Sequence, residues 1–443
     1  MPRITTGRLA DVHVGEGRLV VLGATYFFFV MTSWFILRPI RDELAVAAGI
    51  SRLPWLFTGT LAATLVCQPL FASLVRRLSP KRFIPIAYRF FLANLLAFYA
   101  LTRWLPAADQ TALGLAFFWW TNVFNLFVIS VFWGFMADVC DPEQARRLFG
   151  LIAIGGTIGA IVGTAVTASL VERIGTVNLL LASAVLLELA VQTVRRFPER
   201  ATGTATPSLG ADPRPVGGGI WAGLTHVARS RYLAAIALYL VLYTIGSTFL
   251  YFEQADIVGK HIADRAARTA FLAWLELGSQ SLTALTQAFV TGRMMKWLGV
   301  GVTLAVLPLA SIGGFVTLAT LPTIAVLTFV VVLRRASNFA LTNPATEVLF
   351  TVVRREDKYK AKSFIETFVY RSGDQIGAWS FAGLLALGLT LPSIALVGAA
   401  SSVLPLLIAF WLGAQQSAMA RARAEGAEGD VAVTSGPPHP SAA

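Results

Sequence analysis

Charged side chains interrupt several long apolar stretches of this sequence. They are Arg89, Glu276, Arg334, Arg335, Glu347, Glu366, Arg371 and Asp374. A charge at mid-bilayer costs roughly 2.5–3.5 kcal/mol in insertion measurements, so such residues persist mainly where they face water or an opposite charge. Arginine also binds carboxylate and phosphate groups through paired hydrogen bonds. The pattern therefore predicts a polar, anion-binding cavity inside a membrane protein.

Helical spacing gathers polar residues on one side of three predicted helices. The stretch 323–352 carries such a stripe at intervals of four residues, formed by Arg334, Asn338, Thr342 and Thr346. We assign substrate binding to Arg334, Arg335, Asn338, Arg371, Arg89, Asn122 and Asn125. We assign charge pairing or proton coupling to Glu276, Glu347, Glu366 and Asp374. The alternative is that these charges are structural ion pairs between helices.

The composition requires a membrane as solvent. Of the residues 56% are hydrophobic and 14% are charged, with a mean hydropathy of +0.67, values beyond those of a soluble core. Twelve stretches are long enough to span a bilayer as helices. They lie near 19–47, 54–75, 83–103, 111–137, 148–170, 175–194, 232–252, 269–291, 298–318, 323–352, 364–388 and 393–413.

The basic residues gather in alternate loops. Arginines and lysines cluster after the second, fourth, sixth, eighth and tenth stretches, while the loops after the third, fifth, ninth and eleventh hold one or none. By the positive-inside rule, both termini are then cytoplasmic and the protein lies in a bacterial inner membrane. This distribution accounts for the net charge of +12 without a nucleic-acid partner.

The chain divides into two six-helix halves. We expect a cytoplasmic arm (1–18), a first bundle (19–194), a cytoplasmic linker with an interfacial helix (195–231), a second bundle (232–413) and a disordered tail (414–443). A faint repeat relates FILRPIRDELAVAAG (35–49) to FLYFEQADIVG (249–259), and the segment that begins at 141 to the one that begins at 356. The predicted fold is an all-α membrane protein of twelve helices, like the major facilitator superfamily; other twelve-helix transporter folds remain open.

The repeat also predicts two gates that close alternately. At the outer end it sets Arg38, Arg41 and Asp42 against Glu253 and Asp256. At the cytoplasmic end it sets Asp138, Asp141, Arg146 and Arg147 against Arg354, Arg355, Glu356 and Asp357. The alternative is that these residues are solvated helix ends that contribute little.

Motifs for catalysis or cofactor binding are absent from the sequence. It has no HExxH, Walker lysine motif, GxSxG or cysteine pair, so we expect no catalytic residues, no metal and no cofactor. Gly155, Gly159 and Gly163 recur every four residues without the strand that a nucleotide-binding loop needs, and we interpret them as a helix-packing surface. An integral membrane enzyme is the alternative that polar clusters leave open.

Three segments resemble the ATP/ADP translocases of plastids and obligate intracellular bacteria. They are WFILRPIRDELAV (34–46), VFWGFMADVCDPEQARRLFGL (131–151) and NPATEVLFTVVRREDKYKAKSFIETFVYRSGDQIGA (343–378). The family's ILR motif matches Ile36, Leu37 and Arg38, and its Lys-Ser-Gly signature falls on Arg371, Ser372 and Gly373. Family members have an acidic residue midway along the fourth helix, where this chain has Thr121 and Asn122.

The resemblance implies a secondary transporter that exchanges nucleotides by alternating access. Its partners would be an anionic solute, with a nucleotide suspected, membrane lipids, and a coupling proton or phosphate. Two alternatives remain: a generic facilitator that carries another organic anion or a lipid-like solute, and a non-transporting membrane receptor or assembly partner.

Overall fold

The structure is a computed structural model, which describes residues 13, 16–77, 80–106, 110–197, 227, 230–353, 362 and 365–434. For 70–77, 80–82, 142, 146, 366, 367 and 424–434 it describes the backbone only. The expected linker and its interfacial helix fall almost wholly outside these residues.

Six helices form the first half of the chain. They are α1 (Gly17–Ala48), α2 (Leu53–Arg77), α3 (Pro80–Trp104), α4 (Gln110–Val139), α5 (Pro142–Ile174) and α6 (Thr176–Arg195). Each encloses one predicted stretch, except that α6 begins one residue after the predicted start. The boundaries follow the hydrophobic segments because a chain in lipid must satisfy its own backbone hydrogen bonds.

The second half contains six helical rods, several of which are interrupted by π or 3-10 turns. Their elements are α8 (Arg231–His261); α9 (Arg265–Thr286), η2 (Gln287–Thr291) and α10 (Gly292–Trp297); α11 (Gly299–Thr320); α12 (Ile324–Ser337), η3 (Asn338–Thr342), α13 (Asn343–Leu349) and η4 (Phe350–Val352); η5 (Ile365–Val369) and α15 (Tyr370–Ala386); and α16 (Leu391–Ser401) and α17 (Val403–Thr434). The described residues thus form twelve rods and no strand, which confirms the predicted fold class.

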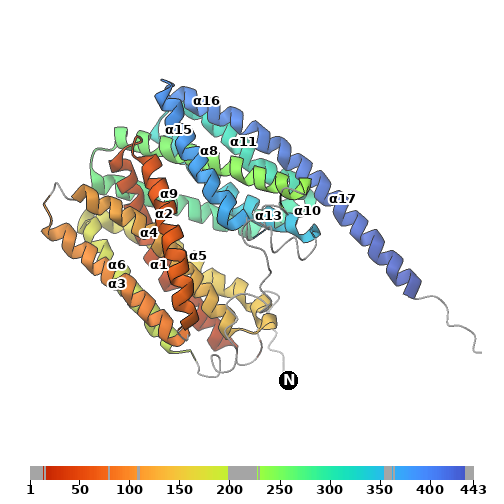
Figure 1. The fold of residues 1–443 in the computed structure, drawn as a ribbon, viewed down its shortest axis with the longest axis horizontal. Coiled ribbons are helices and arrows are strands. Elements are labelled where there is room, and N and C mark those ends of the chain that lie inside the picture. Colours follow the sequence, from red (N-terminus) through yellow and green to blue (C-terminus); the bar gives the residue numbers. More distant parts are fainter. Residues whose placement is uncertain are drawn as a thin grey trace, which may run out of the picture.

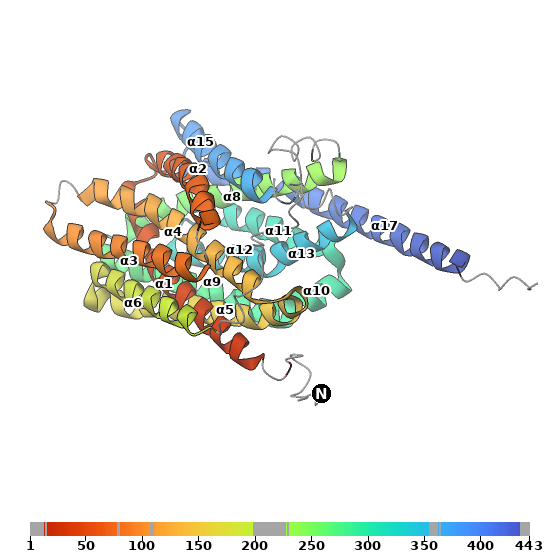
Figure 2. The same ribbon diagram turned by 60° about the horizontal axis from the view of Figure 1, so that its bottom comes forward.

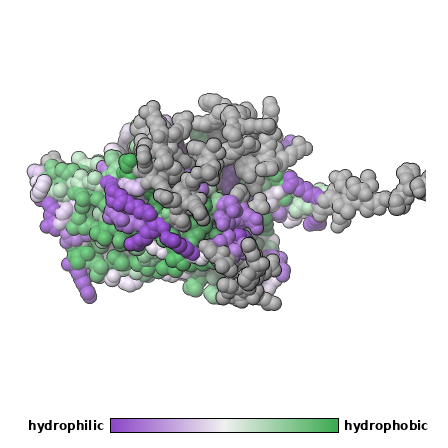
Figure 3. Space-filling view, turned by 90° about the horizontal axis from the view of Figure 1, so that it is seen from below, coloured by the Kyte–Doolittle hydropathy of each residue, from purple (hydrophilic) through white to green (hydrophobic). Residues whose placement is uncertain are grey.

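Nine helices in the described part are long and apolar enough to cross a membrane by length and composition. The rods built on α2, α9 and α15 are not among them. Along α9 the apolar pattern is broken by Arg265, Arg268 and Glu276. Figure 3 shows a face with extensive hydrophobic cover and hydrophilic residues gathered in separate patches.

Glycines of α5 bring this helix against the backbone of α1. A Cβ added to Gly155 would lie 2.2 Å from the carbonyl oxygen of Ala24. The same distance is 2.5 Å from Gly159 to Phe28 and 2.6 Å from Gly163 to Thr32. The predicted use of the glycine stripe in helix packing is confirmed, since no larger side chain fits these positions.

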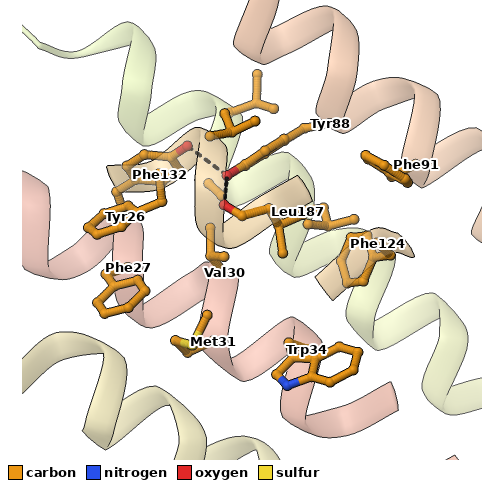
Figure 4. Close-up of a cluster of buried hydrophobic side chains, with 14 of the residues drawn as sticks. Tyr26, Phe27, Val30, Met31, Trp34, Tyr88, Phe91, Phe124, Phe132 and Leu187 are labelled. Atoms are coloured by element: carbon orange, nitrogen blue, oxygen red, sulfur yellow. Dashed lines mark hydrogen bonds between the residues drawn. The ribbon is translucent and has the colours of Figure 1, made fainter. Parts of the chain in front are cut away.

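An aromatic cluster fills the first half around α1 (Figure 4). Tyr26 of α1 and Tyr88 of α3 are fully buried, and their hydroxyls are 2.7 Å apart. The Tyr88 hydroxyl also lies 3.2 Å from the carbonyl of Val128 in α4, to which it donates. The two hydroxyls therefore satisfy each other inside an apolar core, as buried polar groups must, and they tie three helices together.

The helix rod 324–352 changes geometry just before a proline, Pro344. Pro344 has no N–H to give the carbonyl of Ala340. Thr291 of η2 supplies the donor instead, with its hydroxyl 2.7 Å from that oxygen. The five-residue π segment η3 ends two residues before Pro344, so the irregular backbone is stabilised by the neighbouring rod.

The two halves diverge toward one end of the molecule (Figures 1 and 2). We call this end, where α1 and α8 begin, the basic end, because described basic residues such as Arg147 and Arg196 lie beside the start of α1. The opposite end is the far end. A buried apolar cluster at the far end combines residues of both halves, including Val46 and Phe118 from the first with Phe252 and Leu272 from the second. The cluster at the basic end of the second half contains no residue of the first.

A helix occupies most of the segment for which we expect a disordered tail. Helix α17 continues through Thr434 and projects beyond the bundle (Figures 1 and 2). The segment from 414 to 425 is rich in alanine, arginine and glutamine, which are strong helix formers. Its low complexity therefore favours a helix here, and residues 435–443 lie outside the described part.

Candidate functional site

A carboxylate at the far end is shared by arginines from both halves. Arg38 of α1 lies 2.8 Å from Oε1 of Glu276 in α9. Arg335 of α12 binds Oε2 of the same carboxylate. The Glu276 side chain is only 3% exposed and each arginine side chain is 18% exposed. A charge pair this well buried is costly to break, because the remaining partner would be left unpaired.

A second link crosses the halves beside the first. The Tyr251 hydroxyl of α8 donates to Asp42 of α1 over 3.0 Å. Asp42 also pairs with its neighbour Arg41 at 2.6 Å, and Arg41 donates to Asn122 of α4 at 2.9 Å. Together with the shared carboxylate, three arginines meet two carboxylates here, which leaves one positive charge in excess.

Sequence reasoning missed a third ionic link. Glu43 of α1 is 2% exposed and accepts two hydrogen bonds of 3.1 Å from Arg265 of α9. Arg268 lies 4.0 Å from the same carboxylate. The available signal was the position of Glu43 directly after Arg41 and Asp42 in the sequence, on a helix end already assigned to a gate.

Helices α2 and α15 complete the closure. Thr58 of α2 donates to Gln375 of α15 at 3.0 Å, and the Trp379 indole donates to Thr58 at 3.1 Å. The hydrogen bonds between halves within the described residues all lie in the far part of the bundle. The molecule is therefore closed at the far end.

A central cavity of about 780 Å³ lies between the halves and extends to the basic end. Arg38 lines its inner part, and Phe350 and Lys362 line its part nearest the basic end. The volume is within the roughly 300–1,000 Å³ typical of small-molecule sites. An opening at one end and closure at the other are the features of an inward- or outward-facing state in a rocking protein.

The cavity lining combines cations, amides and aromatic rings. Lys362 is 2.8 Å from Glu347, so Arg38 and Lys362 together exceed the lining acids by one charge. The Oδ1 of Asn125 is buried without a hydrogen-bond partner, and buried polar groups are normally satisfied. It is thus an acceptor available to a donor on a bound solute. The other lining amides and rings are Gln280, Gln287, Asn343, Trp34, Phe35, Phe339 and Tyr370.

A smaller side pocket of about 220 Å³ lies between α1, α2, α4, α8 and α15. It brings Arg371 together with Arg41, Asn122 and Thr248. Arg371 lies 3.9 Å from Asp374, a loose pair whose side chains are 37% and 29% exposed. The structure therefore assigns the predicted residues Arg371, Asp374 and Asn122 to this side pocket, next to the gate and outside the central cavity.

Three predicted binding residues of the rod 324–352 line neither space. Arg335 belongs to the link with Glu276 described above, and the other two are Arg334 and Asn338. Arg334 is 5% exposed and donates to the hydroxyls of Ser311 and Ser247, each at 2.8 Å, and to the Tyr243 carbonyl at 3.0 Å. It joins α8, α11 and α12 within one half. Asn338 is 8% exposed in η3 and is absent from the lining. The polar stripe that contains Arg334 and Asn338 therefore faces the interior of the second half at these positions, not the cavity.

Arg89 also lies elsewhere. It forms a two-pronged pair with Glu188 of α6, at 2.7 and 3.1 Å, with 44% of the Arg89 side chain exposed. The pair ties α3 to α6 away from the cavity. The assignment of Arg89 to substrate binding is therefore corrected, because its charge is already compensated by the carboxylate of Glu188.

The predicted partners within the gates also need correction. At the far end Glu276 and Tyr251 oppose Arg38 and Asp42, whereas Asp256 pairs with Lys260 at 2.7 Å. Glu253 binds neither Arg38 nor Arg41.

At the basic end, Asp141 caps α5 by accepting from two backbone N–H groups, and Arg147 pairs with Glu16 at 3.0 Å. Asp138 is partly buried near them, and its Oδ1 has no partner. These contacts stay within one half. Arg354, Arg355, Glu356 and Asp357 lie outside the described residues, and so do the side chains of Arg146 and Glu366.

Comparison with solved structures places this architecture among membrane transporters. The nucleoside transporter NupG matches with a TM-score of 0.61 at 15% identity, over 89% of this chain and 98% of that one. The POT family transporter PepTSo matches with a TM-score of 0.60 at 13% identity, over 90% and 98%. The fucose:proton symporter FucP of E. coli matches with a TM-score of 0.54 at 13% identity, over 89% and 98%.

No protein-family model and no curated protein matches the sequence. The similarity to solved structures is below 25% identity and so concerns the fold. The resemblance to ATP/ADP translocases stays a hypothesis about substrate. The chain has the multi-pass membrane fold of the major facilitator transporters, as the two-half repeat predicts.

Proposed function

We propose that this protein is a secondary-active transporter that moves an anionic solute, of nucleotide type, across a bacterial inner membrane by alternating access. The observation that carries the proposal is the central cavity, which is open at the basic end and closed at the far end by links between the halves. If the basic end is cytoplasmic, as the loop charges predict, this conformation faces inward.

The lining supports the chemical class of the solute. Arg38 and Lys362 offer charge-assisted hydrogen bonds to phosphate, and the aromatic rings offer flat apolar surfaces to a heterocycle. Asn125 offers an unsatisfied acceptor to an amino or hydroxyl group. The fold shared with a nucleoside transporter is consistent with this class.

A thermal-shift screen of the purified protein against nucleotides, sugar phosphates and organic anions tests the class directly. We expect ATP and ADP to raise the melting temperature, because a ligand that binds only the native state stabilises it by mass action. Stabilisation by lipid-like solutes alone would reject the nucleotide class.

Counterflow in proteoliposomes tests transport itself. We expect external ADP to drive loss of preloaded nucleotide. Exchange of ATP for ADP moves one net charge per cycle, worth about 2.3 kcal/mol per 100 mV, so the rate should respond to an imposed potential. Potential-independent exchange would instead indicate compensation by a proton or phosphate. Binding without flux would indicate a receptor.

A further inference from the structure

Glu253 stands out among the buried acids of the described residues. It is 3% exposed on α8, and neither carboxylate oxygen has a hydrogen-bond partner. The other three buried acids, Asp42, Glu43 and Glu276, each bind at least one arginine. An ionised carboxylate without a partner is disfavoured in an apolar interior and takes up a proton instead.

Glu253 lines a small pocket of about 160 Å³ at the far end, between α8, α11 and α16. Around it α11 and the turn after it present Leu318 and Pro322, and α16 presents Leu391, Pro392 and Ala395. Of the two carboxylates that line the pocket, Asp256 pairs with Lys260. Glu253 is left alone between apolar walls, without the several oxygen ligands that a metal ion requires. A proton is the cation that this site suits.

The pocket reaches the far surface. The charged groups at its mouth come from α8 itself: Asp256, Lys260 and His261. Lys260 is 64% exposed and holds Asp256, and the exposed His261 ring lies 2.8 Å from the carbonyl of Ile257. Helices α1, α12 and α15 also contact α8. Each charged group that they carry toward the far end has a partner other than Glu253; these groups are Arg38, Arg41, Asp42, Glu43, Arg334, Arg335, Arg371 and Asp374.

The neighbours of Glu253 along α8 take part in the links between the halves at the far end, which we call the far gate. Tyr251 donates to Asp42, and the Gln254 side chain accepts from Arg335 over 3.4 Å. One side of the far end of α8 thus packs against α11 and α16, and another side makes the gate contacts with Asp42 and Arg335. Ionisation of Glu253 would favour its movement out of the apolar pocket toward water, which would displace both gate contacts.

We propose that Glu253 is a proton-binding site supplied from the far side of the membrane, and that proton binding there holds the far gate closed. A proton on the far side then favours the conformation whose cavity opens at the basic end. The gating part rests on the alternating access proposed above, whereas the proton site does not.

Infrared difference spectroscopy of the full-length protein tests the site. We expect the C=O stretch of a protonated carboxylic acid at neutral pH in the wild type, and its loss in Glu253→Gln. A spectrum in which this substitution removes no such band would overturn the proton site, whatever the transport activity.

Spin-label distances test the gate. Spin labels are attached at Ser51→Cys and Leu387→Cys, two exposed positions at the far end, in a protein without Cys67 and Cys140. The distance between the labels reports how far the two halves are separated at that end. We expect longer distances to gain population as the pH rises from 5 to 9, and Glu253→Gln to keep the short distance throughout. Glu172→Gln, an acid-to-amide change at the exposed far end of α5, is the control and should keep the wild-type pH response. A Glu253→Gln protein that opens with pH like the wild type would refute the coupling.

Discussion

Arg38 in the first half and Glu276 in the second lie 2.8 Å apart, buried at the closed end of the central cavity. The same arginine lines the cavity. A solute anion that reaches Arg38 would therefore compete with Glu276 for it. This relationship connects substrate binding with gate closure, because a ligand shifts a conformational equilibrium only through differential binding to the two states.

Loss of Glu276 should open the far gate. Glu276→Gln removes the charge that holds Arg38 and Arg335 together, and leaves two arginines facing each other. Truncating one partner of a buried pair costs about 2–5 kcal/mol, enough to shift a two-state equilibrium at least tenfold. The measurement is the labelling rate of Leu61→Cys, a side-pocket position on the gate side, by an impermeant maleimide from the far side.

The control for this gate is the exposed pair of Arg89 and Glu188. Glu188→Gln makes the same chemical change within one half and should leave the labelling rate as in the wild type. Equal rates in Glu276→Gln and Glu188→Gln would show that the buried pair does not hold the gate.

Lys362 and Glu347 should have opposite effects on anion binding. Both line the central cavity and lie 2.8 Å apart. Lys362→Gln removes a cation from the lining and should weaken nucleotide binding about tenfold or more, since a hydrogen bond to a charged group contributes roughly 1.5–3 kcal/mol. Glu347→Gln removes the competing carboxylate and should leave affinity unchanged or improve it. Calorimetric titration with ADP gives both affinities.

If both substitutions weaken binding equally, the pair has a structural role. Equal affinities in both variants and the wild type would remove Lys362 from the site. The exposed Lys260→Gln change, at the other end of the molecule, controls for a general loss of positive charge.

The sequence was sufficient for the helices because apolar segments of membrane length have few alternatives to a spanning helix. The glycine stripe of α5 was equally informative, since only close helix packing uses small residues at that spacing. Local patterns of this kind determine local structure, and both predictions are confirmed.

The partners of the charges were harder to predict. Arg89 and Arg335 are alike in sequence, as intramembrane arginines, yet one pairs on an exposed face and the other joins the gate. Their difference depends on which helices become neighbours. That depends on packing between segments more than 50 residues apart, as with Arg335 and Glu276. The internal repeat identified the correct end of α1 but the wrong partners on α8, because it aligns equivalent positions and does not say which of them face each other.

Substitution of Gly155 should disrupt the first half. Gly155→Ala would place a Cβ 2.2 Å from the carbonyl oxygen of Ala24, so α1 and α5 must separate. Overpacking of this kind typically costs about 1–3 kcal/mol. Gly313→Ala in α11 is a matched control because its Cβ would meet nothing within 4 Å. We expect a lower melting temperature in detergent for the first variant, and an equal or higher one for the second because alanine favours helix. Equal melting temperatures would show that α1 can move away from α5 with no loss of stability.

The stability contributed by Glu16 should depend on pH at the basic end. The hydrogen bond from Arg147 is the main cause that lowers the pKa of Glu16 from 4.5 to about 2, and their side chains lie 3.0 Å apart. A lowered folded-state pKa means that the native state holds the ionised form more strongly than the unfolded state does. The stabilisation is therefore fully present above pH 4.5 or so and is lost as the pH falls toward about 2.

Glu16→Gln should melt below the wild type at pH 7, and this difference should shrink between pH 5 and pH 3. Glu172→Gln, at the exposed far end of α5, should show no such convergence. A Glu16→Gln deficit that stays constant over this range would mean that the side chain stabilises the basic end through packing rather than through its charge.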